Sequence, residues 1–212
     1  MEQIRSIALI GGNGKVGRHI ARTAAEKGYH VRMLTRRPAN MPSADKLIEI
    51  REGDAQDIQT IRELLQDCDA VINTLGQPVR AVPIYSIVTS HLLEVMQEYG
   101  MRRYIGVSGG SLDVPGDKKR LVNRIGARAF ELFFPQLMAD KCKELDILLQ
   151  SQHIDWSLVR LPFVKEGPCK GNIKVNLYDM PGSSITNSDI AAFLIRELEV
   201  PAWIRQTPFI SH

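Results

Sequence analysis

Four glycines lie close together near the start of the chain, in the run Gly11-Gly12-Asn13-Gly14-Lys15-Val16-Gly17. The run follows a short apolar segment, Ile7 to Ile10, and precedes a segment whose pattern predicts a helix from Lys15 to about Lys27. A strand, a glycine turn and a helix direct free backbone N–H groups and the positive end of a helix dipole toward an anion. Glycine also lets a pyrophosphate approach the backbone and lets the helix lie close to the sheet. The run therefore predicts a dinucleotide site.

Two registers fit this glycine run. Gly12, Gly14 and Gly17 satisfy G-x-G-x-x-G, and Gly11, Gly14 and Gly17 satisfy G-x-x-G-x-x-G, so position alone does not choose between them. A nucleoside-triphosphate loop is excluded, because Val16 stands where a Ser or Thr would hold magnesium. The remaining alternative is a glycine-rich turn that binds no ligand.

The end of the next predicted strand, residues 29–34, is where a dinucleotide-binding fold selects its cofactor. An acidic residue there would favour the ribose hydroxyls of NAD, whereas an arginine would pair with the 2′-phosphate of NADP. The chain reads Thr35-Arg36-Arg37 at this point and has no acid before Asp45. A planar guanidinium can meet phosphate oxygens in a bidentate fork. We therefore predict that Arg36 binds NADP(H), assisted by Arg37 or Thr35, with NAD(H) still possible and two solvated arginines as the alternative.

Two further predicted strands end in residues suited to the same ligand. A strand over 47–51 leads to Gly53-Asp54, where Asp54 would accept from the adenine amine or cap the following helix. A strand over 69–76 ends in Thr74-Leu75-Gly76, which we expect beside the ribose and phosphates. In a doubly wound sheet the strand order reverses between the first and fourth strands, and ligands bind in the crevice there.

The rest of the chain continues the alternation of strands and helices. The patterns predict helices over 57–66 and 84–99, strands over 103–107 and 155–162, and a long helical segment over 117–152 that Pro135 divides in two. A short strand over 173–176 precedes a closing helix whose start carries Thr186 and Asp189 as a capping pair. This order indicates an α/β fold, a doubly wound (Rossmann-like), mostly parallel sheet in a three-layer α/β/α arrangement.

These features together resemble the atypical short-chain dehydrogenase/reductases, which include proteins of the biliverdin reductase B/flavin reductase type and NmrA-like proteins. The resemblance rests on GGNGKVG, Arg36, the Gly53-Asp54 pair and DAVINTLG at 69–76, and it covers nearly the whole chain. It implies one NAD(P)-binding domain over 1–212, with a small substrate lobe from 109–140 and 163–186. It also implies that the loop at Pro162 approaches the nicotinamide, and that Ser108 holds the serine position of typical members.

The chain departs from typical short-chain dehydrogenases at the catalytic tyrosine. Their Tyr-x-x-x-Lys motif is absent, because Leu137 stands four residues before Lys141 and no tyrosine occurs between Tyr104 and Tyr178. The biliverdin/flavin reductase type that the chain resembles works without this tyrosine. We therefore expect an NADPH-dependent reductase of flavins, quinones or similar planar conjugated acceptors, in which Ser108 orients the carboxamide or the acceptor, or else only satisfies loop backbone. The alternatives are a non-catalytic NADP(H) sensor of the NmrA-like type and a cofactor-conserving epimerase or isomerase.

The overall composition agrees with one globular domain of ordinary size. The 212 residues carry a formal net charge of +3 with scattered basic residues, so we expect no nucleic-acid partner. No apolar run is long enough to span a bilayer, and we expect a cytoplasmic monomer or homodimer acting on a small molecule. The three cysteines and five histidines show no metal-ligand spacing. We expect Trp156 and the Phe133-Phe134 pair in the core, although this pair could also wall a substrate pocket or form a subunit contact.

Overall fold

The computed structural model describes residues 4–36, 38 and 45–212. Its main sheet has eight strands in the order β3-β2-β1-β4-β5-β6-β10-β8, and every neighbouring pair is parallel except β10 and β8. The order reverses between β1 and β4, as predicted. The strands are β1 (Ser6–Ile10), β2 (His30–Thr35), β3 (Ile48–Glu52), β4 (Ala70–Asn73), β5 (Arg103–Gly109), β6 (Asp155–Leu161), β8 (Lys174–Asn176) and β10 (Phe209–Ser211).

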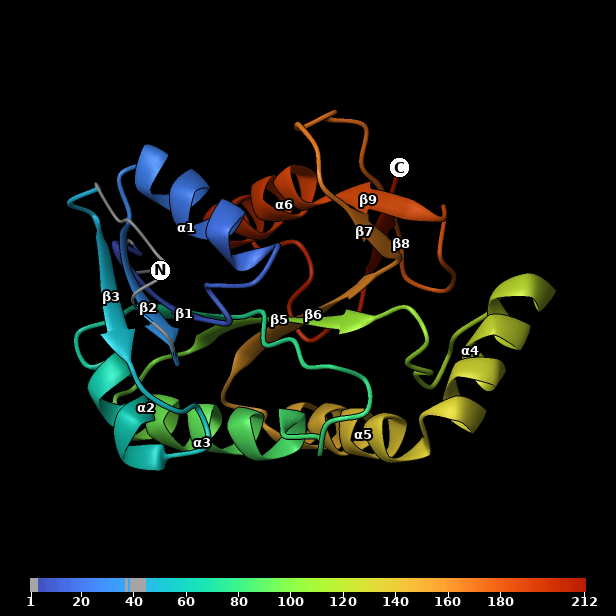
Figure 1. The fold of residues 1–212 in the computed structure, drawn as a ribbon, viewed down its shortest axis with the longest axis horizontal. Coiled ribbons are helices and arrows are strands. Elements are labelled where there is room, and N and C mark those ends of the chain that lie inside the picture. Colours follow the sequence, from blue (N-terminus) through green and yellow to red (C-terminus); the bar gives the residue numbers. More distant parts are fainter. Residues whose placement is uncertain (1–3, 37, 39–44) are drawn as a thin grey trace.

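Helices cover both faces of the sheet, which confirms the three-layer fold. In Figure 1, α1 and α6 lie above the sheet, and α2, α3 and α5 lie below it. A separate apolar cluster lies on each face of the sheet. The cluster beneath α1 and α6 includes Ile7 and Ile210, and the cluster on the other face includes Tyr104, Trp156 and the inner sides of the lower helices. The helices are α1 (Gly17–Glu26), α2 (Ile58–Leu65), α3 (Tyr85–Glu98), α4 (Leu121–Phe133), α5 (Pro135–Gln150) and α6 (Asn187–Glu199).

Three strands were not predicted, and each has only three residues. Two of them, β7 (Phe163–Lys165) and β9 (Ser184–Thr186), pair in parallel as a separate small sheet, and the third, β10, extends the main sheet. Segments this short do not establish a period of two, so their pairing comes from tertiary contacts. The predicted helix break at Pro135 is confirmed, since α4 ends at Phe133 and α5 begins at Pro135.

The prediction that both phenylalanines of the Phe133-Phe134 pair lie in the core is wrong for Phe133. Its exposed fraction is 74%, whereas Phe134 is half-buried with its ring centroid 4.9 Å from that of Phe130. Residues four apart share a helix face, so Phe130 and Phe134 turn toward the protein while Phe133 lies off that face. Trp156 is buried as predicted, with 2% of its surface exposed.

Candidate nucleotide-binding site

A cleft of about 830 Å³ opens where strands β1 to β5 end, beside the glycine run. The predicted residues reach its walls from four segments: the turn after β1, the end of β2, the turn after β3 and the loop after β4. The structure thus brings together the predicted residues Gly11, Asn13, Gly14, Lys15, Val16, Thr35, Arg36, Asp54, Thr74, Leu75 and Gly76. Arg37, also predicted to bind the cofactor, lies outside the described residues.

The glycine turn is packed so tightly that side chains do not fit at its key positions. Gly11 has a φ of +76°, and a Cβ atom there would lie 2.4 Å from the carbonyl oxygen of Thr74. At Gly17 a Cβ would lie 2.3 Å from the carbonyl oxygen of Gly11. The Gly14 N–H closes the turn by donating to that same carbonyl at 3.0 Å. These contacts keep β1, the turn and α1 close together, so that the backbone itself forms the floor of the cleft.

The first turn of α1 suits an anion. The predicted start at Lys15 is two residues early, because Lys15 and Val16 belong to the turn and α1 begins at Gly17. Among the residues that the structure describes, no side chain caps this helix start by a hydrogen bond, and the first turn holds no acidic residue. By contrast, Asp57 accepts from the backbone N–H groups of Gln59 and Thr60 at the start of α2. The start of α1 therefore fits the pyrophosphate of a dinucleotide.

Arg36 and Asp54 line the same cleft at the ends of adjacent strands, β2 and β3. The cap of α2 is Asp57 rather than Asp54. Asp54 instead accepts from the Gln56 backbone N–H at 3.0 Å and from the Gln56 side-chain amide at 3.5 Å, and the residue borders the cleft. Binding of the adenosine end of the cofactor by Arg36 and Asp54 remains a prediction that agrees with this position.

The other end of the cleft is mostly apolar and includes residues that the sequence analysis missed. They come from the loop after β4, the start of α3, β5 and the small sheet, and they are Gln77, Ile84, Val107 and Val164. The Gln77 amide is held within this wall, since its oxygen accepts from the Ile84 N–H at 2.9 Å and its nitrogen donates to the Val82 carbonyl at 3.0 Å. No single residue here carries a motif. Only Val107 could have been found from the sequence: side chains alternate along β5, so Val107 and Ser108 point to opposite faces of the sheet.

Three predicted site residues do not line the cleft. Ser108 is 6% exposed, and its hydroxyl has no hydrogen-bond partner among the described residues. Gly12 lies on the side of the turn that faces Met33, where a Cβ would overlap the Met33 side chain. Pro162 lies between β6 and β7. The proposed roles of these three residues toward the cofactor stay predictions.

Lys141, one of the two lysines (with Lys143) that could end a Tyr-x-x-x-Lys motif if a tyrosine stood four residues earlier, is buried. Its ammonium donates to Glu144 at 2.9 Å and lies 3.5 Å from the centroid of the Tyr85 ring. Glu144 in turn accepts from Thr89, whose hydroxyl lies 3.4 Å from that of Tyr104. Burial, followed by the nearby Glu144 charge, raises the pKa of Tyr104 far above its usual value. The Lys141 ammonium and the Tyr104 hydroxyl are thus parts of a buried network and do not border the cleft.

The comparison with known families identifies the class of protein. The sequence model of the NAD(P)H-binding family matches residues 11–201. The chain therefore belongs to this NAD(P)H-binding family, and it binds NAD(P)(H). The match begins at the first glycine of the turn and ends just after α6.

Solved structures share the fold along their whole length. A short-chain dehydrogenase/reductase from Veillonella parvula in complex with NADP has a TM-score of 0.83 at 13% identity, over 99% of this chain and 95% of that chain. A candidate NADH-flavin reductase from Streptococcus pneumoniae has a TM-score of 0.77 at 24% identity, over 97% and 98%. A candidate epimerase from Bacteroides thetaiotaomicron has a TM-score of 0.82 at 24% identity, over 99% and 98%. In the part of this chain that the structure describes, no helix is long and apolar enough to cross a membrane.

Proposed function

We propose that this protein is an NADPH-dependent oxidoreductase that transfers hydride to a planar conjugated acceptor such as a flavin or a quinone. One observation carries the proposal: the cleft has the elements of a dinucleotide site, yet none of the described residues lining it is a tyrosine, and its apolar end holds only Gln77 as a polar side chain. Because that amide is engaged with Ile84 and Val82, the described residues of this apolar wall supply no proton donor of the usual kind.

The acceptor chemistry follows from the missing proton donor. Reduction of an isolated ketone builds negative charge on one oxygen, which needs a positioned acid. A flavin takes the hydride at N5 and spreads the charge over its rings, and a proton from water completes the reduced flavin while NADP⁺ is released. The main task of the protein is then to stack the acceptor over the nicotinamide, for which an apolar wall containing Ile84, Val107 and Val164 is suited.

The segments 109–140 and 163–186 form the substrate lobe in this proposal. Val164 of β7 supports this assignment, since it reaches the cleft from the second segment. Candidate acceptors would enter between this lobe and the loop after β4.

Arg36 selects NADPH over NADH in this proposal, because it lies at the cleft edge where β2 ends. Fluorescence titration of wild type and Arg36→Ala with both cofactors tests this role. We expect Arg36→Ala to weaken NADPH binding about 10- to 100-fold, equivalent to the loss of one charge-assisted phosphate contact, and to leave NADH binding nearly unchanged. The matched control is Arg22→Ala, whose side chain lies on the outside of α1 and is 80% exposed. Equal weakening of both cofactors, or none, would contradict the phosphate role.

Turnover separates the reductase from its rival. NADPH consumption is measured under air with FMN, riboflavin and a small quinone, each against a reaction without protein. Acceptor-dependent consumption above that background supports the proposal. Tight NADPH binding without turnover of any acceptor would contradict it and favour a non-catalytic sensor of the NmrA-like type.

A further inference from the structure

Helix α4 exposes an unusual amount of apolar surface. Five large hydrophobic side chains on its 13 residues are exposed by 59% to 79% of their area, and only Ala127 of the helix is buried. They are Leu121, Val122, Ile125, Leu132 and Phe133. Figure 1 shows α4 at the edge of the molecule, away from the two main layers of helices. Monomeric proteins rarely leave so many large apolar side chains together in water.

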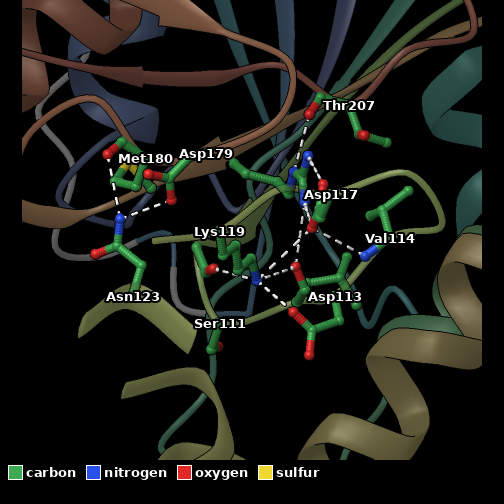
Figure 2. Close-up of polar contacts among 12 residues, drawn as sticks. Ser111, Asp113, Val114, Asp117, Lys119, Asn123, Asp179, Met180 and Thr207 are labelled. Carbon is green, nitrogen blue, oxygen red and sulfur yellow. Dashed lines mark hydrogen bonds and ion pairs between the residues drawn. The ribbon is translucent and has the colours of Figure 1, made fainter. Parts of the chain in front are cut away.

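The chain before α4 is held by a buried polar cluster. Arg160 of β6 is fully buried and forms two hydrogen bonds with the Asp117 carboxylate, at 2.6 and 2.9 Å. Lys119 donates to Asp113 at 2.7 Å and to the carbonyls of Gly110 and Leu112. Figure 2 shows the contacts of Asp113, Asp117 and Lys119 in this cluster. Because these contacts fix the segment before α4, we infer that α4 keeps one position relative to the rest of the protein.

A second contact fixes the first turn of α4 itself. Asn123 donates to the Asp179 carboxylate at 2.7 Å and to the carbonyl of Met180 at 3.3 Å (Figure 2). Arg120, just before the helix, pairs with Asp179 at 3.2 Å. The inner face of α4 therefore carries Asn123, Ala127 and Phe130. The exposed apolar residues lie on the other side of the helix and point away from the protein.

The exposed face has the spacing of a helix-pairing seam. Val122, Ile125, Ala129 and Leu132 are separated by three, four and three residues, the a and d positions of a heptad. Ala127 then takes the f position, opposite the seam, which agrees with its burial against its own subunit. The seam carries no charged residue. The flanking Arg128 is paired with Glu131 at 2.9 Å on the same helix.

This seam is complementary to itself when two copies run antiparallel. With a two-fold axis at the level of residue 127, Val122 lies opposite Leu132 of the second copy, and Ile125 lies opposite Ala129. The large side chain meets the small one at the centre, where two helices approach most closely, and the same pairs repeat on the other side of the axis, as a two-fold interface requires. A parallel pair would instead place Ile125 against itself and Ala129 against itself, and would leave a gap at Ala129.

We propose that α4 is a homodimer interface, in which the helices of two copies of this chain pack antiparallel along the seam Val122, Ile125, Ala129 and Leu132. Five mostly exposed side chains of this size offer on the order of 500–700 Å² of apolar surface per subunit, near the roughly 800 Å² per partner of a standard interface. The dimer is therefore expected to dissociate in the micromolar range. The proposal does not depend on the acceptor or on hydride transfer.

The first test is sedimentation equilibrium over a range of protein concentrations. Wild type should shift from monomer to dimer, and the double variant Val122→Glu with Leu132→Glu should raise the dissociation constant at least about 100-fold, because every substitution occurs twice in the interface. Val200→Glu is the matched control, since Val200 is 64% exposed and lies outside α4. Unchanged NADPH affinity shows that the variants are folded. A wild type that stays monomeric, or a dimer that the double variant leaves intact, would overturn the proposal.

Cross-linking tests the direction of packing without relying on a disruptive variant. In a background with Cys142→Ser and Cys169→Ser, which removes the exposed thiols, Val122→Cys together with Leu132→Cys should form a covalent dimer on mild oxidation. Val122→Cys alone should not, because the two copies of residue 122 are about 15 Å apart when the helices are antiparallel. Efficient cross-linking of the single variant would overturn the antiparallel arrangement. Monomeric protein that co-sediments with anionic phosphatidylglycerol vesicles would show a membrane contact instead and would also overturn it.

Discussion

A methyl group at Gly11 should damage cofactor binding more than stability. Gly11→Ala places a side chain at φ +76°, which costs roughly 1–2 kcal/mol for an L-residue. In addition, its Cβ would lie 2.4 Å from the Thr74 carbonyl oxygen, closer than real Cβ atoms come, so the turn or the loop after β4 must move. Both segments line the cleft. Because a displacement of this kind misplaces several backbone contacts to the pyrophosphate, we expect NADPH affinity to fall at least about 100-fold.

Gly28→Ala provides the matched control for this prediction. Gly28 has a φ of +87°, yet a Cβ there meets no heavy atom within 4 Å, and the residue follows the far end of α1. The control variant therefore has the backbone strain without the overlap. Urea unfolding should show both variants destabilised, and fluorescence titration should show NADPH binding lost only for Gly11→Ala. If Gly11→Ala binds NADPH like wild type, the turn does not form the pyrophosphate site and the reasoning is refuted.

Two further predictions concern groups outside the cleft. Burial alone would raise the pKa of Asp189, but hydrogen bonds from Thr186, Cys169 and the backbone N–H groups of Lys170 and Gly171 outweigh it and hold that pKa well below its usual range. The ionised Asp189 carboxylate therefore stabilises the fold fully above about pH 4, and this stabilisation is lost as the pH falls further. In urea unfolding, Asp189→Asn should lower the free energy of unfolding by about 2–4 kcal/mol at pH 7 and by less at pH 3. An equal loss at both pH values would contradict this prediction. Leu137→Tyr restores the spacing Tyr-x-x-x-Lys but should yield no NADPH-dependent ketone reduction, because Lys141 is held by Glu144 and Tyr85; ketone turnover by this variant would show that Lys141 can reach the cofactor.

Strands β1 to β6 of the main sheet and the turn after β1 could be predicted because local signals determine them. The apolar runs that became β1 and β4 are continuous, and the glycines of the turn mark a tight connection between a strand and a helix. Strand order then brought Arg36 and Asp54 to one edge, which the doubly wound topology alone implies. These predictions need only the hydrophobic periodicity of the sequence and the parallel direction of the strands.

The remaining features depend on contacts that a pattern does not reveal. Phe133 and Phe134 are identical neighbours, and only the direction in which α4 leaves the body decides which of them is buried. Arg160 reads as an ordinary strand residue, yet it is fully buried because Asp117, 43 residues earlier, supplies its counter-charge. Val164 borders the cleft through a three-residue strand whose partner, β9, is about twenty residues away in sequence.

In the proposed function, this chain transfers hydride from NADPH to a conjugated acceptor. The most direct test is an anaerobic single-turnover experiment in which the protein with bound NADPH is mixed with FMN while nicotinamide and flavin absorbance are followed together. We expect NADPH to be oxidised and FMN to be reduced in equal amounts, much faster than in the absence of protein, and we expect Gly11→Ala to abolish this acceleration. Reduction no faster than the protein-free reaction, for FMN and likewise for riboflavin and a small quinone, would contradict it.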